Sequence, residues 1–289
     1  MILVAGATGS LGGKIVSGLA EQGTPVRCLV RSGSKAERLS GSGVEICRGN
    51  LRDPDSLEAA CVGIRTVIST ASATNRSDDT PDHVDDEGNR NLIEAAMRSG
   101  ASQFILISTL GASLDSPVPA FRAKASAEAA LRDSGLTYTV LQPNAFMDVW
   151  FGMLIEAPIA MGRPVTLVGE SRRRHSFIAE RDVAAFAIAA TQNPAAWDTT
   201  LVVGGPEAVS FHDVVHAYEK ALQRSISIQY VEPGQPIPGT PEPVWGIAAA
   251  LESFDSPIPM TDLARQFEVR LTSIQDHAGR SRLAAPAPQ

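Results

Sequence analysis

Short apolar segments alternate with amphipathic ones along the first half of the chain. The apolar runs are nearly continuous, which is typical of strands buried on both faces of a parallel sheet. They lie at residues 2–5, 25–30, 44–49, 66–71, 103–108 and 136–143. Apolar residues at helical spacing predict helices at 53–63, 85–100 and 123–135. This alternation predicts a doubly wound α/β fold, in which ligands bind at the carboxyl ends of the strands.

The pattern is less regular after residue 150. Further elements are predicted as strands at 164–169 and 200–205, helices at 180–192 and 210–222, and proline-rich loops at 232–243 and 255–260. No linker is long enough to make this part independent. We therefore expect a main domain over residues 1–150 and a smaller α/β lobe over 151–289, with some strands returning to the main sheet.

A glycine cluster follows the first predicted strand. Gly6, Gly9 and Gly12 stand at three-residue spacing, and a helical pattern of apolar residues then continues to Gly23. In this context the first glycine permits a tight turn, the second lets the backbone approach a pyrophosphate, and the third lets the helix pack closely. The alternative is a glycine-rich turn that binds nothing. We expect a dinucleotide site of the Rossmann type, with contacts from Gly6, Thr8, Gly9, Ser10, Leu11 and Gly12.

The residues after the second predicted strand bear on the choice of cofactor. Where this fold binds NAD, an acidic side chain near this position accepts a hydrogen bond from the ribose 2′-hydroxyl. Arg31 stands there instead, with Lys35 four residues further on. A guanidinium pairs with a phosphate through two hydrogen bonds, and a lysine adds a point charge. The sequence therefore predicts NADP(H) in preference to NAD(H), unless the two cations are ordinary solvated loop charges.

Composition narrows the function classes. The 289 residues are 44% hydrophobic and carry a formal net charge of −7, so we expect a globular protein without direct nucleic-acid binding. No apolar run is long enough to span a membrane, and the early first strand leaves no room for a signal peptide. Cys28, Cys47 and Cys61 lack metal-ligand spacing, and the five histidines indicate no metal site. We interpret the cysteines as reduced thiols of a cytoplasmic protein.

The motifs in combination resemble a known family. The segments "GATGSLGGKIV", "NLIEAAMRSGASQFILIS" and "FIAERDVAAF" are similar to the NmrA-like branch of the atypical short-chain dehydrogenase/reductases, a likeness that runs from residue 1 to about 225. That branch includes quinone reductases, azo and triphenylmethane dye reductases and redox-sensing regulators. The resemblance implies a Rossmann domain with a small C-terminal substrate lobe and a preference for NADP. Gln142 departs from the arginine that is more usual in the family.

The typical members of the wider family carry a tyrosine four residues before a lysine, and a serine at the end of the fifth strand. The tyrosine transfers the proton, and the lysine binds the ribose and lowers the tyrosine's pKa. Ser108 and Lys124 match two of these positions, but Ala120 stands where the tyrosine is needed. We therefore do not expect a conventional alcohol dehydrogenase. Lys124 is expected to hold the ribose or protonate a developing anion, and Ser108 to polarise the acceptor; the alternatives are a solvated helix-terminal charge and a strand-end hydroxyl.

Further residues are expected to complete the site. The cofactor is expected to contact Asn50, Leu51, Thr70, Ala71, Lys124, Pro143 and Asn144. Apolar walls for a substrate are expected from Phe121, Phe146, Met147, Trp150 and Phe151, for which core packing is the alternative. The basic run at 171–177 is interpreted as a solvated loop, or else as a rim that meets an anionic substrate or a partner.

The leading hypothesis is an NADPH-dependent reductase of a small, hydrophobic, conjugated substrate such as a quinone, an enone or an azo compound. Such an acceptor delocalises the charge that hydride brings, so a tyrosine acid is dispensable. The rival hypotheses are a non-catalytic NADP(H)-binding redox sensor of the NmrA type and a natural-product tailoring reductase. We expect a monomer or a homodimer.

Overall fold

The computed structural model describes residues 1–37, 39, 43–73, 80–281 and 283. The chain divides into two compact units. Unit 1 comprises Met1–Pro143, Glu180–Val202 and Phe267–Val269, and unit 2 comprises Asn144–Ala179, Val203–Gln266 and Arg270–Gln289. The chain therefore first leaves unit 1 after residue 143 and returns to it twice.

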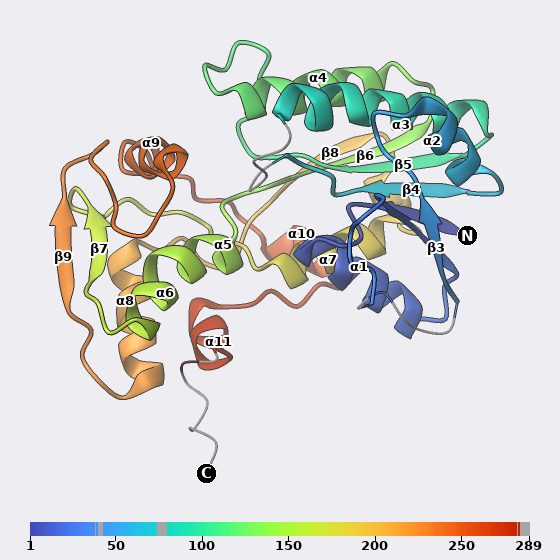
Figure 1. Cartoon of the computed structure of the whole chain (residues 1–289). Helices are drawn as coiled ribbons and strands as arrows, with labels where there is room; N and C mark the ends of the chain where they lie inside the picture. Colours follow the sequence, from blue (N-terminus) through green and yellow to red (C-terminus); the bar gives the residue numbers. More distant parts are fainter. Residues whose placement is uncertain (38, 40–42, 74–79, 282, 284–289) are drawn as a thin grey trace. The chain divides into compact units, whose positions relative to one another are not determined.

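Unit 1 is built on a seven-stranded sheet with the order β3-β2-β1-β4-β5-β6-β8 (Figure 1). Its strands are β1 (Ile2–Ala5), β2 (Val26–Val30), β3 (Val44–Arg48), β4 (Thr66–Ser69), β5 (Gln103–Ile107), β6 (Thr137–Pro143) and β8 (Thr199–Val203). Neighbouring strands from β3 to β6 pair in parallel. The chain order reverses at β1 and β4, so the carboxyl ends of these two strands flank the crevice in which a doubly wound fold binds its ligand.

Helices cover both faces of this sheet (Figure 1). One face carries α1 (Ser10–Glu21) and α7 (Glu180–Ala190), which pack against each other. The other face carries α2 (Pro54–Cys61), α3 (Asn89–Arg98) and α4 (Pro119–Arg132), in contact in that order. A short 3₁₀-helix, η3 (Pro194–Ala196), precedes β8. The predicted doubly wound α/β fold is confirmed.

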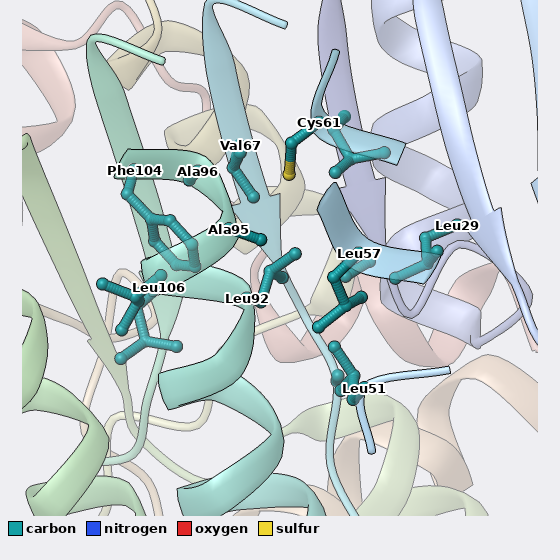
Figure 2. Close-up of a cluster of buried hydrophobic side chains, with 14 of the residues drawn as sticks. Leu29, Leu51, Leu57, Cys61, Val67, Leu92, Ala95, Ala96, Phe104 and Leu106 are labelled. Atoms are coloured by element: carbon teal, nitrogen blue, oxygen red, sulfur yellow. The ribbon is translucent and has the colours of Figure 1, made fainter. Parts of the chain in front are cut away.

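A core cluster fills the space between the sheet and helices α2 and α3 (Figure 2). Leu57 of α2, Leu92 of α3 and Phe104 of β5 are completely buried in it. Cys61 lies in the same cluster, and burial raises the pKa of its thiol to about 11. Because all three cysteines of the chain are free thiols, packing rather than a covalent bridge holds unit 1 together.

Unit 2 contains the predicted strand at 164–169 and the predicted helix at 210–222, together with several elements that the sequence pattern did not predict. The segment after Phe146 is helical, as α5 (Met147–Phe151), the π-helix η2 (Gly152–Glu156) and α6 (Ala157–Ala160). A two-stranded parallel sheet pairs β7 (Val165–Val168) with β9 (Ile228–Val231). The remaining helices are α8 (Phe211–Leu222), α9 (Glu242–Leu251), α10 (Thr261–Gln266) and α11 (Ile274–Gly279). None of the helices in the described part of the chain is long and apolar enough to cross a bilayer.

Candidate functional site

The glycine turn joins β1 to α1 at the carboxyl edge of the sheet. Gly6 has a φ of +78°, and the N–H of Gly9 donates to its carbonyl oxygen at 2.9 Å. A Cβ added at Gly12 would lie 2.2 Å from the Gly6 oxygen, so only glycine lets α1 pack this closely on the turn. At Gly9, an added Cβ would meet only that same oxygen among the described residues, at 3.2 Å. The protein thus leaves the space in front of Gly9 open, as a bound pyrophosphate requires.

The beginning of α1 offers unpaired backbone donors to an anion. Gly9 is its N-cap and supplies no side-chain cap, so the first N–H groups of this 12-residue helix lack helical partners. Thr8, Gly9 and Ser10 are exposed. The Ser10 hydroxyl and the Lys14 ammonium both donate to the Glu180 carboxylate, the lysine at 2.6 Å. Together with the open space at Gly9, these N–H groups and the positive end of the helix dipole fit a dinucleotide pyrophosphate.

Three cationic side chains lie around the loop that follows β2. Arg31 is half-buried and Lys35 is exposed in that loop. Arg48, from the end of β3, donates to the carbonyls of Arg31 at 2.9 Å and Ser34 at 3.2 Å. Arg48 thus fixes the backbone that carries Arg31, and these three residues, here called the cation cluster, lie at or just after the ends of the paired strands β2 and β3.

The loop after β3 is held by its own hydrogen bonds. The Asn50 N–H donates to the Ser56 hydroxyl at 3.1 Å, and the Asn50 carboxamide oxygen accepts from the Arg52 N–H. Leu51 is buried, and its carbonyl accepts from the Asn91 side chain at 2.9 Å. Asn50 remains exposed on this fixed backbone.

The end of β4 packs directly on the glycine turn. The N–H and the hydroxyl of Thr70 donate to the Ala5 carbonyl at 3.0 and 3.1 Å. A Cβ at Gly6 would lie 2.5 Å from the Thr70 hydroxyl oxygen. Gly6 is therefore, after Gly12, a second position of the turn where a side chain would clash. Ala71 is buried next to Thr70. Unit 1 therefore brings together Gly6, Thr70 and Ala71, three of the residues predicted to contact the cofactor.

Lys124 is buried in unit 1 rather than solvated. Lys124 lies in the second turn of α4, and its side chain is 14% exposed. The ammonium contacts a carboxylate oxygen of Asp85 at 3.0 Å and donates to the carbonyl of Ile107, the last residue of β5, at 3.3 Å. The Asp85 side chain is 1% exposed. This arrangement places a paired ammonium at the carboxyl end of the sheet, in the position that the resemblance assigns to a site lysine.

Ser108 belongs to a second buried cluster. Its hydroxyl donates to the Glu128 carboxylate, which also accepts from Gln142 at 2.9 Å and from Arg132 at 2.7 Å. Arg132 reaches on to the Thr200 hydroxyl of β8. A hydroxyl carries one proton, so the Ser108 that donates to Glu128 does not at the same time donate to a substrate. The Ser108 hydroxyl was expected to polarise the substrate by donating a hydrogen bond. With its proton donated to Glu128, its oxygen is left to accept a hydrogen bond instead.

Most of the residues expected to form apolar walls lie in a core. In unit 2, Met147, Trp150 and Phe151 pack with Phe177 and Phe211 in one buried cluster. Their exposed fractions are 1%, 9% and 0%, so little of these three side chains can face a substrate without a rearrangement. Two other residues of the set, Phe121 of α4 and Phe146 before α5, are only half-buried.

The chain changes units between Pro143 and Asn144. Pro143 ends β6, and its carbonyl accepts from the Leu110 N–H at 3.0 Å. In unit 2, the Asn144 side chain donates to the carbonyl and the hydroxyl of Ser256, both at 3.0 Å. Each residue is thus fixed within its own unit.

The basic run at 171–177 is balanced by acids of unit 2. Arg172, Arg173 and Arg174 have side chains at least half exposed. Arg173 lies 3.5 Å and Arg174 3.9 Å from the carboxylates of Asp255 and Asp213, respectively. His175 is instead buried, between the Ser256 hydroxyl at 2.7 Å and the Leu251 carbonyl at 2.9 Å. These local pairings agree with a loop in solvent better than with an anion-binding rim.

A protein-family model described as NAD(P)H-binding matches residues 6–194. The match covers more than half of the chain and includes both the glycine turn and Lys124. The chain belongs to the NAD(P)H-binding family. Its resemblance to the NmrA-like, atypical short-chain dehydrogenase/reductases is confirmed by the relatives that it matches.

Two curated relatives and one solved structure illustrate this similarity. An NAD(P)H azoreductase of Xenophilus azovorans is 33% identical over 226 residues, which cover 78% of this chain and 75% of the relative. The photosystem II assembly factor Ycf39 of Synechocystis sp. is also 33% identical, over 80% of this chain and 70% of the relative. The triphenylmethane reductase of Citrobacter sp., solved with NADP(H), superposes with a TM-score of 0.78 at 21% identity, over 96% of this chain and 99% of that one. At that identity the last likeness concerns the fold alone.

The charged residues of the unit 1 clusters that sequence reasoning missed include Lys14, Arg48, Asp85 and Glu128. A signal existed for two of them. Lys14 follows Ser10 by four residues and Glu128 follows Lys124 by four, so each shares a helix face with an expected site residue. Arg48 and Asp85 reach the clusters only through the order of the strands, which no local pattern reveals.

Proposed function

We propose that this protein is an NADPH-dependent reductase of a small, hydrophobic, conjugated substrate such as a quinone, an enone or an azo compound. The observation that carries the proposal is the paired ammonium of Lys124 at the carboxyl end of β5. The ammonium forms an ion pair with Asp85 and donates a hydrogen bond to the Ile107 carbonyl. Lysine has three N–H donors, so donor capacity remains for a cofactor hydroxyl or for the substrate. The azoreductase relative supports the same reaction class.

Each residue then has a defined task. When bound, NADPH supplies the hydride. The glycine turn and the first N–H groups of α1 hold the pyrophosphate, while Thr70 and Ala71 line the cofactor beside the turn. The Lys124 ammonium holds a ribose hydroxyl and stabilises the negative charge that develops on the acceptor. Ser108 offers its oxygen to a donor. A proton for the reduced product comes from water.

The tyrosines argue for a conjugated acceptor. Tyr138 lies near the start of β6, away from the carboxyl end of the sheet. In unit 2, the Tyr218 hydroxyl donates to Glu156 at 2.6 Å, and burial raises the pKa of this hydroxyl. Tyr230 is exposed in β9. Because Ala120 stands four residues before Lys124, where typical family members carry the tyrosine acid, the substrate itself must spread the incoming charge, which quinones, enones and azo compounds do.

The cation cluster after β2 supports a preference for NADP(H) over NAD(H). Arg31 and Lys35 occupy the position where an NAD-binding chain carries an acid, and Arg48 orders the loop beneath them. We also propose Asn50 and Leu51 as contacts of the same end of the cofactor. Pro143 and Asn144 are proposed for the nicotinamide end, and Phe121 and Phe146 for the substrate. The three free thiols agree with the reducing environment of the cytoplasm.

A non-catalytic NADP(H)-binding regulator is the second candidate. The absence of the tyrosine acid suits a protein that binds the dinucleotide without turnover. The match to Ycf39, which is named an assembly factor rather than an enzyme, favours the same class.

The deciding experiment mixes the protein with NADPH and a panel of quinones, enones and azo dyes, and follows the nicotinamide absorbance. A reductase oxidises NADPH only when an acceptor is present. A regulator binds NADPH, seen by fluorescence titration, and oxidises it with no member of the panel. The control is Gly9→Leu, which keeps the fold but fills the pyrophosphate space. Equal NADPH affinity in parent and control would refute the assigned dinucleotide site.

A further inference from the structure

Asp85 connects the site lysine to the loop that follows β4. One oxygen of its carboxylate contacts the Lys124 ammonium at 3.0 Å, and the other accepts the N–H of Ala73 at 2.9 Å. Ala73 lies two residues beyond Ala71, the expected cofactor contact at the end of β4. A single carboxylate therefore joins α4 to the segment expected to line the cofactor.

The backbone that carries Asp85 is anchored independently of Lys124. Asp85 lies in the π-helix η1 (Asp82–Gly88), a wide turn of a kind that is frequent at functional sites. The Asn89 side chain donates to the carbonyls of Val84 and Asp85 at 3.2 and 3.0 Å, and it accepts from the Ser69 hydroxyl at 2.6 Å. Since Ser69 ends β4, η1 is tied directly to the strand end at the site.

Of the two adjacent acids Asp85 and Asp86 in η1, Asp85 pairs with Lys124. Asp86 pairs with Arg90 at 3.9 Å, and both side chains are about one-third to one-half exposed. Asp85, by contrast, is 1% exposed and faces an ammonium that is 14% exposed. Carboxylates are rarely buried this deeply unless they are paired, and the loss of one partner leaves the other charge uncompensated.

We propose that Asp85 is a positioning residue for Lys124, an inference that rests on the proposed function. Asp85 holds the ammonium at a fixed place and links it to the loop at Ala73, so that the lysine and the cofactor loop move as one body. The ion pair with Asp85 and the hydrogen bond to the Ile107 carbonyl together fix the place of the ammonium nitrogen. A lysine on its flexible stem has no such fixed place without these two partners.

The test compares Asp85→Asn, Lys124→Met and the double variant with the parent, and uses Asp86→Asn as the matched control. Asp85→Asn keeps the shape and an oxygen for the Ala73 N–H but removes the charge. We expect its kcat for quinone reduction to fall about tenfold to a hundredfold, the scale of a misplaced site group. The KM for the quinone should stay within about twofold, because Asp85 does not touch the substrate. Asp86→Asn should match the parent in kcat and in NADPH affinity.

The double variant separates positioning from a merely structural role. In the Lys124→Met background, Asp85→Asn should cost no further kcat, since there is no ammonium left to position. It should also raise the melting temperature relative to Lys124→Met, because it removes the uncompensated buried charge. Parent-like kcat in Asp85→Asn, or equal losses in both backgrounds, would overturn the inference. If the parent itself fails to oxidise NADPH, the proposed function fails instead; NADPH affinities and melting temperatures of the four proteins then decide whether the two residues act together.

Discussion

Substitutions at Gly9, Gly12 and Gly13 should distinguish a loss of NADPH binding from a loss of folding stability. At Gly9 the backbone has φ −75° and ψ 168°, which any residue adopts without strain, and a Cβ meets only the Gly6 oxygen at 3.2 Å. Gly9→Leu should therefore cost about 1 kcal/mol in the free energy of unfolding, because leucine is a poorer N-cap than glycine and its Cβ lies close to a backbone oxygen. The leucine occupies the pyrophosphate space, however, and removes hydrogen bonds to a charged group worth about 1.5–3 kcal/mol each. Loss of two such bonds weakens NADPH binding by about a hundredfold to ten-thousandfold.

Gly12 should behave in the opposite way. Its Cβ would lie 2.2 Å from the Gly6 carbonyl oxygen and 2.7 Å from the Gly6 carbonyl carbon, which are backbone atoms that cannot rotate away. Overpacking of this kind costs about 1–3 kcal/mol, and the better helix propensity of alanine offsets about 1 kcal/mol of it. Gly12→Ala should thus lower the melting temperature by about 2–4 °C for each kcal/mol that remains. Gly13→Ala is the matched control, because its Cβ comes no nearer than 3.7 Å to the Ala7 oxygen.

The assay is a fluorescence titration with NADPH alongside thermal unfolding of each variant. We expect Gly9→Leu to melt only about 2–4 °C below the parent and not to bind NADPH. Gly12→Ala should melt earlier than the parent, and Gly13→Ala should bind and melt at or slightly above the parent temperature. Parent-like NADPH affinity in Gly9→Leu would show that the turn is not the pyrophosphate site. An equal loss of stability in Gly12→Ala and Gly13→Ala would refute the close-packing argument.

Two further predictions concern cofactor choice and pH. Arg31→Ala should weaken NADPH binding by about 1.5–3 kcal/mol and leave NADH binding unchanged, because only NADPH carries the 2′-phosphate; equal losses in parallel titrations would contradict that assignment. Burial lowers the pKa of His175 below its ordinary value of 6.5, so below pH 6.5 the unfolded chain takes up a proton that the folded chain resists. Stability should therefore be full above pH 6.5 and fall as the pH drops below it. Melting temperatures from pH 8 to 5 should show this decline and a shallower one in His175→Asn; identical slopes would exclude His175 as the cause.

The local pattern of apolar and polar residues predicts most elements of unit 1 and few of unit 2. Strands β1, β2, β4 and β5 are buried along nearly their whole length and their sequences are largely apolar, so most of the parallel sheet could be predicted without long-range information. Strand β3 is mostly exposed, and its pattern is correspondingly weaker. Strand β9 could not be predicted in this way, because its two central residues are exposed. The helix α9 begins at Glu242, inside the stretch 232–243 that was predicted as a loop, so that prediction was wrong for its last two residues. Helices α5 and α6 are too short for a helical period to stand out. These elements are stabilised by tertiary contacts, which a single sequence does not display.

Among the site residues, too, those whose contacts lie within one segment were predictable, and those whose partners come from distant segments were not. The glycine turn was predictable because backbone conformation, close packing and anion binding all depend on residues within one short segment. The partner of Ser108 was not, because Glu128 and Gln142 meet it only after α4 and β6 are packed on the sheet. In that pairing the Ser108 hydroxyl donates to Glu128, so its assignment to the site stays a prediction in which its oxygen is the group left to accept.

The ion pair between Lys124 and Asp85 changes how the Lys124→Met variant has to be interpreted. The sequence offered two interpretations, a site lysine or a solvated charge, and the unfavourable helix dipole argued only weakly between them. The structure decides against solvation, since Asp85 faces the ammonium at 3.0 Å from a nearly inaccessible position. A loss of turnover in Lys124→Met would therefore combine the missing ammonium with a buried, unpaired carboxylate, a defect worth about 3–5 kcal/mol in stability. Only the comparison of Asp85→Asn with the double variant removes that second effect. A reductase then still loses turnover when the lysine is removed, whereas a regulator changes in NADPH affinity alone.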